Sequence, residues 1–344
     1  MTSPLFDNPS GHHDHSQQKS GKKALTAQLL FLLLAIGLFV FFRDRPQFHT
    51  LGIIFVSIVL EAFPFMLLGA LIGGLIEVFI AQETITRFLP ERRWWAVFIG
   101  AAMGLIFPVC ECAIVPVIRR LLKKGVPLSA AIAFLLGGPI VNPLVAASTA
   151  VAYFADWSIV IHRMVLGYFI AVAGGLLMNL FFSKTTAVRN EVFSGQNPIN
   201  GETLCDHRKP AALGEKITLA VSHAANDFFD IGRFLVIGAF FAAVLQTLVP
   251  RQVFSAVTDP PALSILIMML MAIGLNLCSE ADAFVAASFR STPVPLTAQM
   301  AFMVLGPMLD IKLILMYFNV FRLRAIATLA ALVFLMVFLS MVII

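Results

Sequence analysis

Two short stretches that contain cysteine and acidic residues interrupt the long apolar runs of this chain, one in each half. Residues 107–116 read FPVCECAIVP, and residues 278–282 read CSEAD. Each stretch places a cysteine close to a carboxylate where an apolar segment is broken. Backbone that departs from a regular helix at membrane depth is tolerated only where protein or a water-filled cavity surrounds it. If the flanking runs cross a membrane, both stretches are therefore expected inside the protein.

The composition supports a membrane location for these runs. Of the 344 residues, 59% are apolar and only 12% are charged, whereas soluble domains carry about 25% charged residues. This balance excludes a cytosolic enzyme, a disordered protein and a nucleic-acid-binding domain. The apolar runs are long and continuous, which argues against a barrel built from alternating strands. The predicted fold class is an all-α polytopic membrane protein.

Nine apolar segments approach or exceed the roughly 20 helical residues that cross a bilayer. They are 25–42, 50–81, 95–118, 127–154, 158–182, 217–249, 262–289, 294–320 and 323–344. The first is expected to be an uncleaved helix, because no cleavage site of small residues follows it. The predicted division is a disordered polar tail containing histidines (1–24), an extra membrane helix (25–48), a first membrane repeat (49–182), a cytoplasmic loop (183–216) and a second membrane repeat (217–344).

An internal repeat relates the two halves without a gap over about 35 residues. Adding 168 to the residue number pairs Cys110 with Cys278, Gly138 with Gly306, Pro139 with Pro307, and Asn142 with Asp310. When the offset is increased by one residue, Glu61 matches Asp230. Cysteine, proline and glycine that coincide at matched spacing indicate a duplication more strongly than matching apolar residues do.

The distribution of the 24 Lys and Arg residues favours one of two topologies. If every segment crosses once, the cluster at 119–124 faces outward, against the preference of Lys and Arg for the cytoplasmic side. If 95–124 and 262–290 are re-entrant hairpins, most positive charges lie in the cytoplasm and the two halves become inverted repeats. Inverted repeats with broken helices that meet near the bilayer midplane are typical of secondary transporters. The N-terminus is then cytoplasmic, in a bacterial inner membrane.

The cysteines are the first candidates for chemistry. Cys110 and Cys112 form a Cys-x-Cys pair, and Cys278 is the repeat partner of Cys110. Thiols select soft metals and metalloids, so all three are predicted to bind substrate. The alternative is that they pack in the core as small apolar residues.

Three carboxylates in these stretches are predicted to couple transport to protons or ions: Glu111, Glu280 and Asp282. Ionisable groups inside a membrane are costly and by default mark ion or proton pathways. The alternative is a structural salt bridge.

Asn142 and Asp310 follow equivalent Gly-Pro breaks and are predicted to bind substrate, or alternatively to cap a helix. Lys312 lies two residues from Asp310 and is expected to neutralise it. A second polar set consists of Glu61, Asp227, Asp230 and Arg233. Of these, Asp230 and Arg233 are spaced to pair on one helix face.

Nucleotide-binding loops, dinucleotide fingerprints and nucleophile elbows are absent from the sequence. We therefore expect a protein that is not an enzyme, has no cofactor and holds no structural metal. Its expected partners are a small-molecule or metalloid substrate and the lipid bilayer.

The chain resembles the ArsP/YraQ-type predicted permease family. The resemblance rests on FPVCECAIVP at 107–116, GVP at 125–127, AFLLGGP at 133–139 and NP at 142–143. One departure is Ala113, which replaces a glycine usual in the family after Cys-x-Cys. The resemblance implies a permease, and members characterised as ArsP imply efflux of trivalent organoarsenicals or arsenite.

The residues and the resemblance together predict a secondary efflux permease for a thiol-seeking solute, with proton coupling. A carrier of another small solute or a divalent cation is the alternative, and a membrane thiol oxidoreductase is a further one.

Overall fold

The computed structural model describes residues 46–79, 93–189, 192, 213–248 and 261–343. The chain divides after Gly52 into two compact units. Of the first unit, only residues 46–52 are described, and they form the first turns of a helix. The predicted polar tail and the first apolar segment lie outside the described residues, as does most of the predicted cytoplasmic loop.

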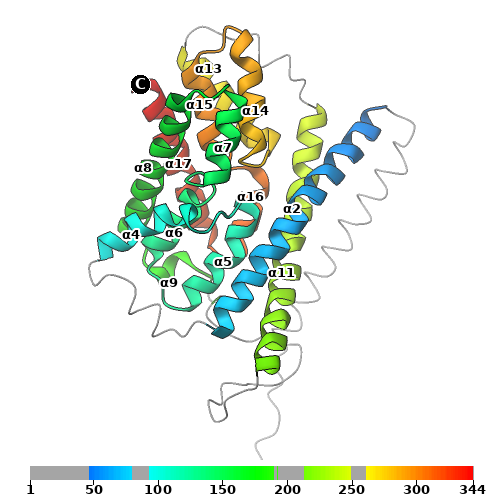
Figure 1. Ribbon diagram of the computed structural model, residues 1–344, viewed down its shortest axis with the longest axis vertical. Coiled ribbons are helices and arrows are strands. Elements are labelled where there is room, and N and C mark those ends of the chain that lie inside the picture. The colour runs from blue at the N-terminus through cyan, green and yellow to red at the C-terminus, as the bar shows by residue number, and fades with distance from the viewer. Residues whose placement is uncertain (1–45, 80–92, 190–191, 193–212, 249–260, 344) are drawn as a thin grey trace, which may run out of the picture. The chain divides into compact units, whose positions relative to one another are not determined.

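The described part of the chain is helical, with one isolated bridge between Val188 and Phe321. The first half contains α2 (Pro46–Phe79), α4 (Arg93–Ala102), η1 (Met103–Leu105), α5 (Glu111–Lys123), α6 (Leu128–Gly137), α7 (Pro143–Ala152), α8 (Trp157–Phe181) and α9 (Lys184–Ala187). The second half contains α11 (Leu213–Leu248), α13 (Pro261–Leu275), α14 (Ala281–Ser288), η2 (Phe289–Ser291), α15 (Leu296–Leu305), α16 (Ile311–Tyr317) and α17 (Leu323–Ile343). Figure 1 shows these elements.

Among the described residues, four helices are long and apolar enough to cross a membrane. They are His49–Phe79, Trp157–Phe181, Lys216–Thr247 and Leu323–Ile343. Five shorter apolar helices accompany them. The all-α polytopic class predicted from the composition is confirmed.

The shorter helices result from the breaks expected in the sequence. The segment 127–154 forms α6 and α7, which are separated by residues 138–142. The segment 294–320 forms α15 and α16, separated by residues 306–310. A helix of 10 residues, such as α6, is about 15 Å long. Each such helix therefore covers about half of a bilayer's apolar core.

The repeat found in the sequence reappears in the bounds of the helices. Helix α4 begins at Arg93 and α13 at Pro261, 168 residues later. Both ends of α6 (Leu128–Gly137) and α15 (Leu296–Leu305) are related by the same offset. Matching sequence therefore folds into matching helices in the two halves.

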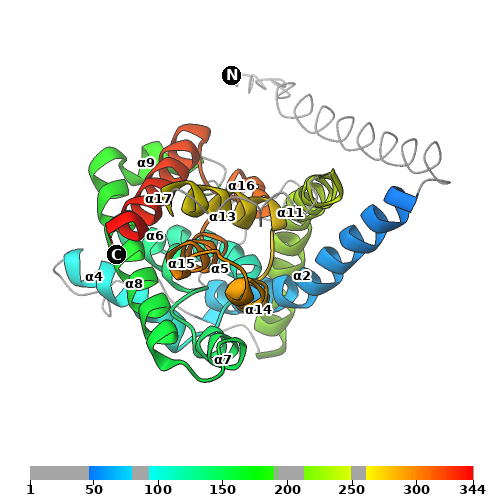
Figure 2. The ribbon, with the colours of Figure 1, turned by 90° about the horizontal axis from the view of Figure 1, so that it is seen from above.

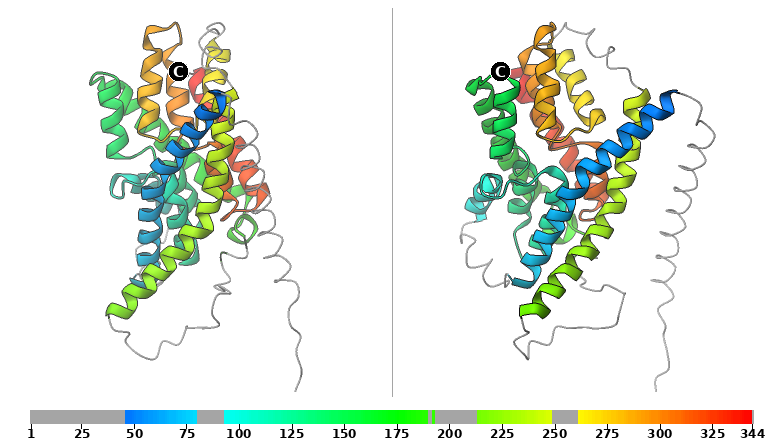
Figure 3. Two further views of the ribbon diagram at one scale, coloured as in Figure 1. Left: turned by 90° about the vertical axis from the view of Figure 1, so that its right-hand side faces the viewer. Right: turned by 45° about the vertical axis from the view of Figure 1, so that its right-hand side comes forward.

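Equivalent long helices of the two halves run in opposite directions. In Figure 1, α2 and α8 run downward, whereas α11 and α17 run upward. Helices α2 and α11 lie against each other (Figure 3), and the rings of Phe63 and Phe228 are 5.0 Å apart. These directions favour the inverted relation of the halves, which stays a prediction.

Helices α5 and α15, which lie nearest the centre, are among the most buried elements. Seen from above, α5 and α15 lie in the middle, with α7, α8, α13, α14 and α17 around them (Figure 2). Nearly every residue of α5 is buried, including Glu111, Arg119 and Arg120. The charged groups of α5 must therefore find partners inside the protein.

Candidate functional site

A small pocket brings together the predicted cysteine motifs of both halves. Its volume is about 10 Å³, which is room for about one water molecule. The lining residues are Ile58, Glu61, Ala62, Phe65, Cys110, Glu111, Cys112, Cys278 and Lys312. They come from α2, the start of α5, the turn before α14, and α16.

Helix starts position the cysteines. Cys110 is the N-cap residue of α5 and has an extended backbone, with φ −73° and ψ 168°. Its carbonyl accepts the backbone N–H groups of Ala113 and Ile114. In the second half, the carbonyl of Cys278 accepts the N–H groups of Ala281 and Asp282 at the start of α14. The three described cysteines are free thiols.

Glu111 is the most constrained carboxylate of the pocket. Its side chain is 1% exposed, and the ammonium of Lys312 lies 3.1 Å from its Oε1. The same ammonium is 3.6 Å from Asp310 Oδ2, so Lys312 neutralises Asp310 as expected. Two buried opposite charges stay ionised when their mutual attraction offsets the loss of water. One cation from the second half thus holds a carboxylate from the first.

Asn142 and Asp310 act as equivalent caps. Asn142 Oδ1 accepts the backbone N–H of Leu144 over 2.9 Å at the start of α7. Asp310 Oδ1 accepts the N–H of Leu313 over 2.6 Å at the start of α16. Both side chains are fully buried, and neither lines the pocket. The capping alternative holds, and substrate binding by these two residues stays a prediction.

Asp282 forms a salt bridge, which was the alternative for this residue, with a partner that the sequence analysis did not name. Arg163 on α8, 1% exposed, places Nη2 2.8 Å and 2.9 Å from the two carboxylate oxygens. The same guanidinium donates to the carbonyl of Ser279 over 3.0 Å and to Thr149 over 2.7 Å. The sequence did contain a signal for this pair, because an arginine inside the apolar segment 158–182 needs a partner within the membrane. Arg163 therefore ties α8 to the turn that presents Cys278.

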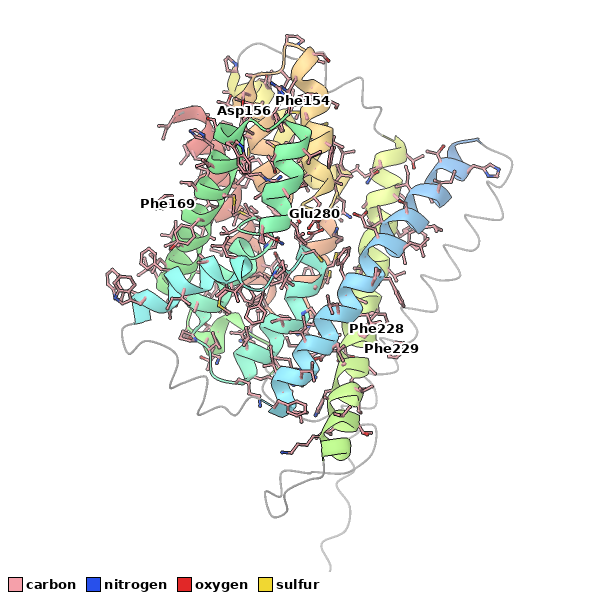
Figure 4. The ribbon with its side chains drawn as sticks, viewed as in Figure 1. Phe154, Asp156, Phe169, Phe228, Phe229 and Glu280 are labelled. Carbon is pink, nitrogen blue, oxygen red and sulfur yellow. The ribbon has the colours of Figure 1, made fainter. Side chains whose placement is uncertain are left out.

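Glu280 has a different environment. The hydroxyl of Ser279 lies 3.3 Å from Glu280 Oε2 and 3.4 Å from Glu111 Oε2. Figure 4 shows Glu280 near mid-height, well below the α7–α8 turn marked by Phe154 and Asp156. The predicted coupling roles of Glu111, Glu280 and Asp282 stay predictions.

A second charged cluster joins α5, α2 and α11 away from the pocket. Arg119 and Arg120 both contact Asp227, and Arg119 lies 3.3 Å from Asp230. Arg120 also lies 3.5 Å from Glu77. The two arginines are thus buried partners of acids and not exposed loop charges.

The predicted pairing of Asp230 with Arg233 is wrong. The carboxylate of Asp230 faces Arg119 from the other half. Arg233 instead donates to the backbone carbonyl of Asp230 and lies over the ring of Phe234. Helical spacing permits a pair on one face, but a buried guanidinium on a neighbouring helix competes for the same carboxylate.

Glu61 does not lie with the other acids of the second polar set. It lines the pocket beside Cys278, whereas Asp227 and Asp230 belong to the second cluster. Among the described residues, no group of three or more His, Cys, Asp or Glu side chains is arranged to hold a metal ion. The pocket therefore combines thiols, two carboxylates and one lysine.

Comparison with known proteins places this chain in a family. A family model described as a predicted permease matches residues 47–344. The chain belongs to this predicted permease family. UPF0718 protein YcgR of Bacillus subtilis is 39% identical over 280 residues, which cover 81% of this chain and 92% of that protein. No solved structure matches the chain.

Two further relatives extend the comparison. A putative two-component membrane permease complex subunit of Streptococcus mutans is 37% identical over 273 residues, covering 79% of this chain and 87% of that protein. UPF0718 protein YraQ of Escherichia coli is 29% identical over 100 residues, 29% of this chain and 28% of that protein. The family description and the long apolar helices of this chain make it a membrane permease, which implies transport.

Proposed function

We propose that this permease exports a thiol-seeking solute, a trivalent organoarsenical or arsenite, in exchange for protons across a bacterial inner membrane. The observation that carries the proposal is the convergence of Cys110, Cys112 and Cys278 on one pocket. These thiols come from both halves of the chain. Soft trivalent arsenic exchanges between sulfur ligands, and thiols select such soft centres.

The composition of the pocket also supports a neutral solute over a divalent metal. Lys312 places a fixed positive charge in the wall, and Glu111 is already paired with it. A divalent cation bound close to this ammonium would be repelled at short range in a medium of low polarity. A neutral arsenic hydroxide avoids that repulsion while still meeting the thiols.

Transport further requires the pocket to open. Space for about one water is too small for arsenic with its oxygen or carbon substituents. Helix α2 supplies four lining residues, Ile58, Glu61, Ala62 and Phe65. Its movement would enlarge the pocket toward either side in alternation, as in transporters built from inverted repeats.

Everted membrane vesicles test the proposal. We expect uptake of a trivalent arsenical driven by an imposed proton gradient, and loss of this uptake when Cys110 and Cys112 are replaced together by serine. Cys205→Ser, in the polar loop predicted from the sequence, is the matched control and should transport like the parent. Equal amounts of each protein in the membrane must be shown by immunoblotting.

The outcomes discriminate between the alternatives. Full transport by the Cys110→Ser/Cys112→Ser variant would reject the role of the thiols. Absence of arsenical flux, together with flux of another small solute or a divalent cation in the same panel, would favour the alternative carrier.

A further inference from the structure

We propose that Glu61 on α2 is the residue that carries the coupling proton through this permease, an inference that rests on the proposed exchange of solute for protons. The carboxylate is placed to alternate between a protonated state and an ionised state as the pocket opens to opposite sides. This assigns the coupling to a residue outside the two broken motifs.

The first argument is the pairing of the charges around the pocket. Glu111 is held by Lys312, which also contacts Asp310. Glu61 lines the same pocket, yet the described residues provide it with no ion-pair partner. The other ionisable groups that line the pocket with it are the thiols of Cys110, Cys112 and Cys278. A carboxylate at membrane depth is uncommon and by default marks an ion or proton pathway.

Among the described residues, no cation of the neighbouring helix α11 forms an ion pair with Glu61 either. On α11, Asp227 and Asp230 contact the arginines of α5. Arg233 of α11 is directed to the carbonyl of Asp230 and the ring of Phe234. The other described acid of α2, Glu77, lies 3.5 Å from Arg120. Glu61 thus differs from the nearby acids of both helices, whose carboxylates have arginine partners.

The internal repeat gives an independent argument. Glu61 matches Asp230 in the sequence repeat, but Asp230 lies 3.3 Å from Arg119. The offset of 168 carries Arg119 onto Ala287, which is apolar and cannot pair with Glu61. Duplication therefore produced two equivalent acids, of which one is fixed by an arginine and the other is left to exchange a proton.

The third argument is mechanical. Pro64 lies inside α2, one turn beyond Glu61. Because proline has no backbone N–H, the carbonyl of Leu60 four residues earlier loses its helical hydrogen bond, and the helix can bend there. The bend adjoins the pocket. Movement about it would carry Glu61 from one side of the pocket to the other.

The proton balance of a cycle is simple. Glu61 accepts one proton from water on the outer side, and its carboxyl is then neutral and can enter the closed pocket. After α2 moves, the O–H bond breaks and the proton passes to water on the inner side. The solute crosses in the opposite direction while the Glu61 carboxylate is ionised. No oxidant, reductant or other reactant is required.

Transport by a Glu61→Gln variant tests this role. The amide mimics the protonated carboxyl, so we expect downhill flux of the arsenical to remain while accumulation driven by a pH gradient is lost. Glu61→Asp should restore part of the accumulation. Glu77→Gln, on the same helix, should keep the dependence on the gradient. Accumulation by Glu61→Gln equal to that of the parent would overturn the proposal.

A second measurement does not require the solute. Dicyclohexylcarbodiimide modifies protonated carboxyl groups in apolar surroundings, and mass spectrometry of the intact permease in vesicles locates the adduct. We expect modification of Glu61 that increases as the pH falls, with Glu111 protected by Lys312. Failure to modify Glu61 at any pH would overturn the proposal even if arsenical transport is found. Modification of Glu61 without arsenical transport would support Glu61 as the proton carrier and reject the arsenical as the substrate.

Discussion

At the scale of single residues, the buried charges of this permease act mainly as bridges between the two halves. Lys312 of the second half holds Glu111 of the first, and Arg163 of the first holds Asp282 of the second. All four side chains are 4% exposed or less. An unpaired charge at such depth is far more costly than a paired one. The pairs therefore fix which parts of the two halves can meet.

The Arg163–Asp282 pair allows a prediction about stability. Arg163→Met leaves Asp282 as an unpaired buried charge, and we expect a loss of about 3–5 kcal/mol. This corresponds to a decrease on the order of 5–10 °C in the unfolding midpoint of a chain of this size. The midpoint can be measured on detergent-purified protein by a thiol-independent fluorescence assay.

The matched control removes both charges. Arg163→Met combined with Asp282→Leu should recover at least part of the lost stability, because no isolated charge remains. A double variant that is less stable than either single one would show that the pair is not the source of the effect.

At the scale of elements, close contact between helices depends on small residues. Gly69 of α2 packs directly on the backbone of Ala113 in α5, so that a Cβ at this position would overlap the Cα and Cβ of Ala113. Gly69, Gly73 and Gly74 lie close together in α2, and small residues of this kind allow membrane helices to pack closely. This contact brings α2, with Glu61, against the start of α5, with the cysteine pair.

A pair of glycine variants tests the contact. We expect Gly69→Ala to destabilise the protein by about 1–3 kcal/mol through overpacking, although alanine is otherwise the better helix former. Gly214→Ala is the control, because nothing lies within 4 Å of a Cβ there. Thermal unfolding and gradient-driven transport should both be measured. Equal stability of Gly69→Ala and Gly214→Ala would contradict the close approach of α2 and α5.

At the scale of the whole molecule, the direction of the long helices predicts which segments face each side of the membrane. Ser158 lies in the first turn of α8 and Thr185 lies beyond its other end, in α9. A helix of 25 residues spans about 37 Å. Lys123 at the end of α5 and Ser291 at the end of η2 are equivalent under the offset of 168. Inverted halves place these two equivalent positions on opposite sides.

Cysteine accessibility tests this arrangement. With the N-terminus inside, Ser158→Cys and Ser291→Cys should react with an impermeant maleimide in intact cells. Thr185→Cys and Lys123→Cys should react only after permeabilisation. The parent protein, with its native cysteines, gives the background. Reaction of positions 123 and 291 from the same side would reject the inverted relation of the halves.

Several features of the fold were predictable because they depend on local sequence. The helices break at 107–110, 138–142, 276–280 and 306–310, where proline, glycine or polar residues interrupt apolar runs. Asn142 and Asp310 begin the following helices, as a capping residue at such a break does. The grouping of Cys110 and Cys278 was expected from the repeat, because the predicted inverted halves would bring equivalent breaks together near the midplane.

Other contacts could not be predicted because they depend on which helices meet. The separation of Glu61 from Asp230 is one case, since both were assigned to one polar set. The pairing of Arg163 with Asp282 joins residues 119 positions apart. The residues that flank Arg163 in the sequence do not indicate Asp282 as its partner, and those that flank Asp282 do not indicate Arg163.

The sequence alone therefore determined the membrane class of this permease, the matching segments of its two halves, its broken helices and the cysteine motifs, because these follow from hydropathy, backbone preference and spacing along the chain. The tertiary structure decided which charges are neutralised. Lys312, Arg163, Arg119 and Arg120 each meet an acid, while Glu61 faces the thiols without a cation among the described residues. Ion pairing acts over a few ångströms in space and is independent of separation in sequence, so only the packed helices reveal which acids have a cation partner.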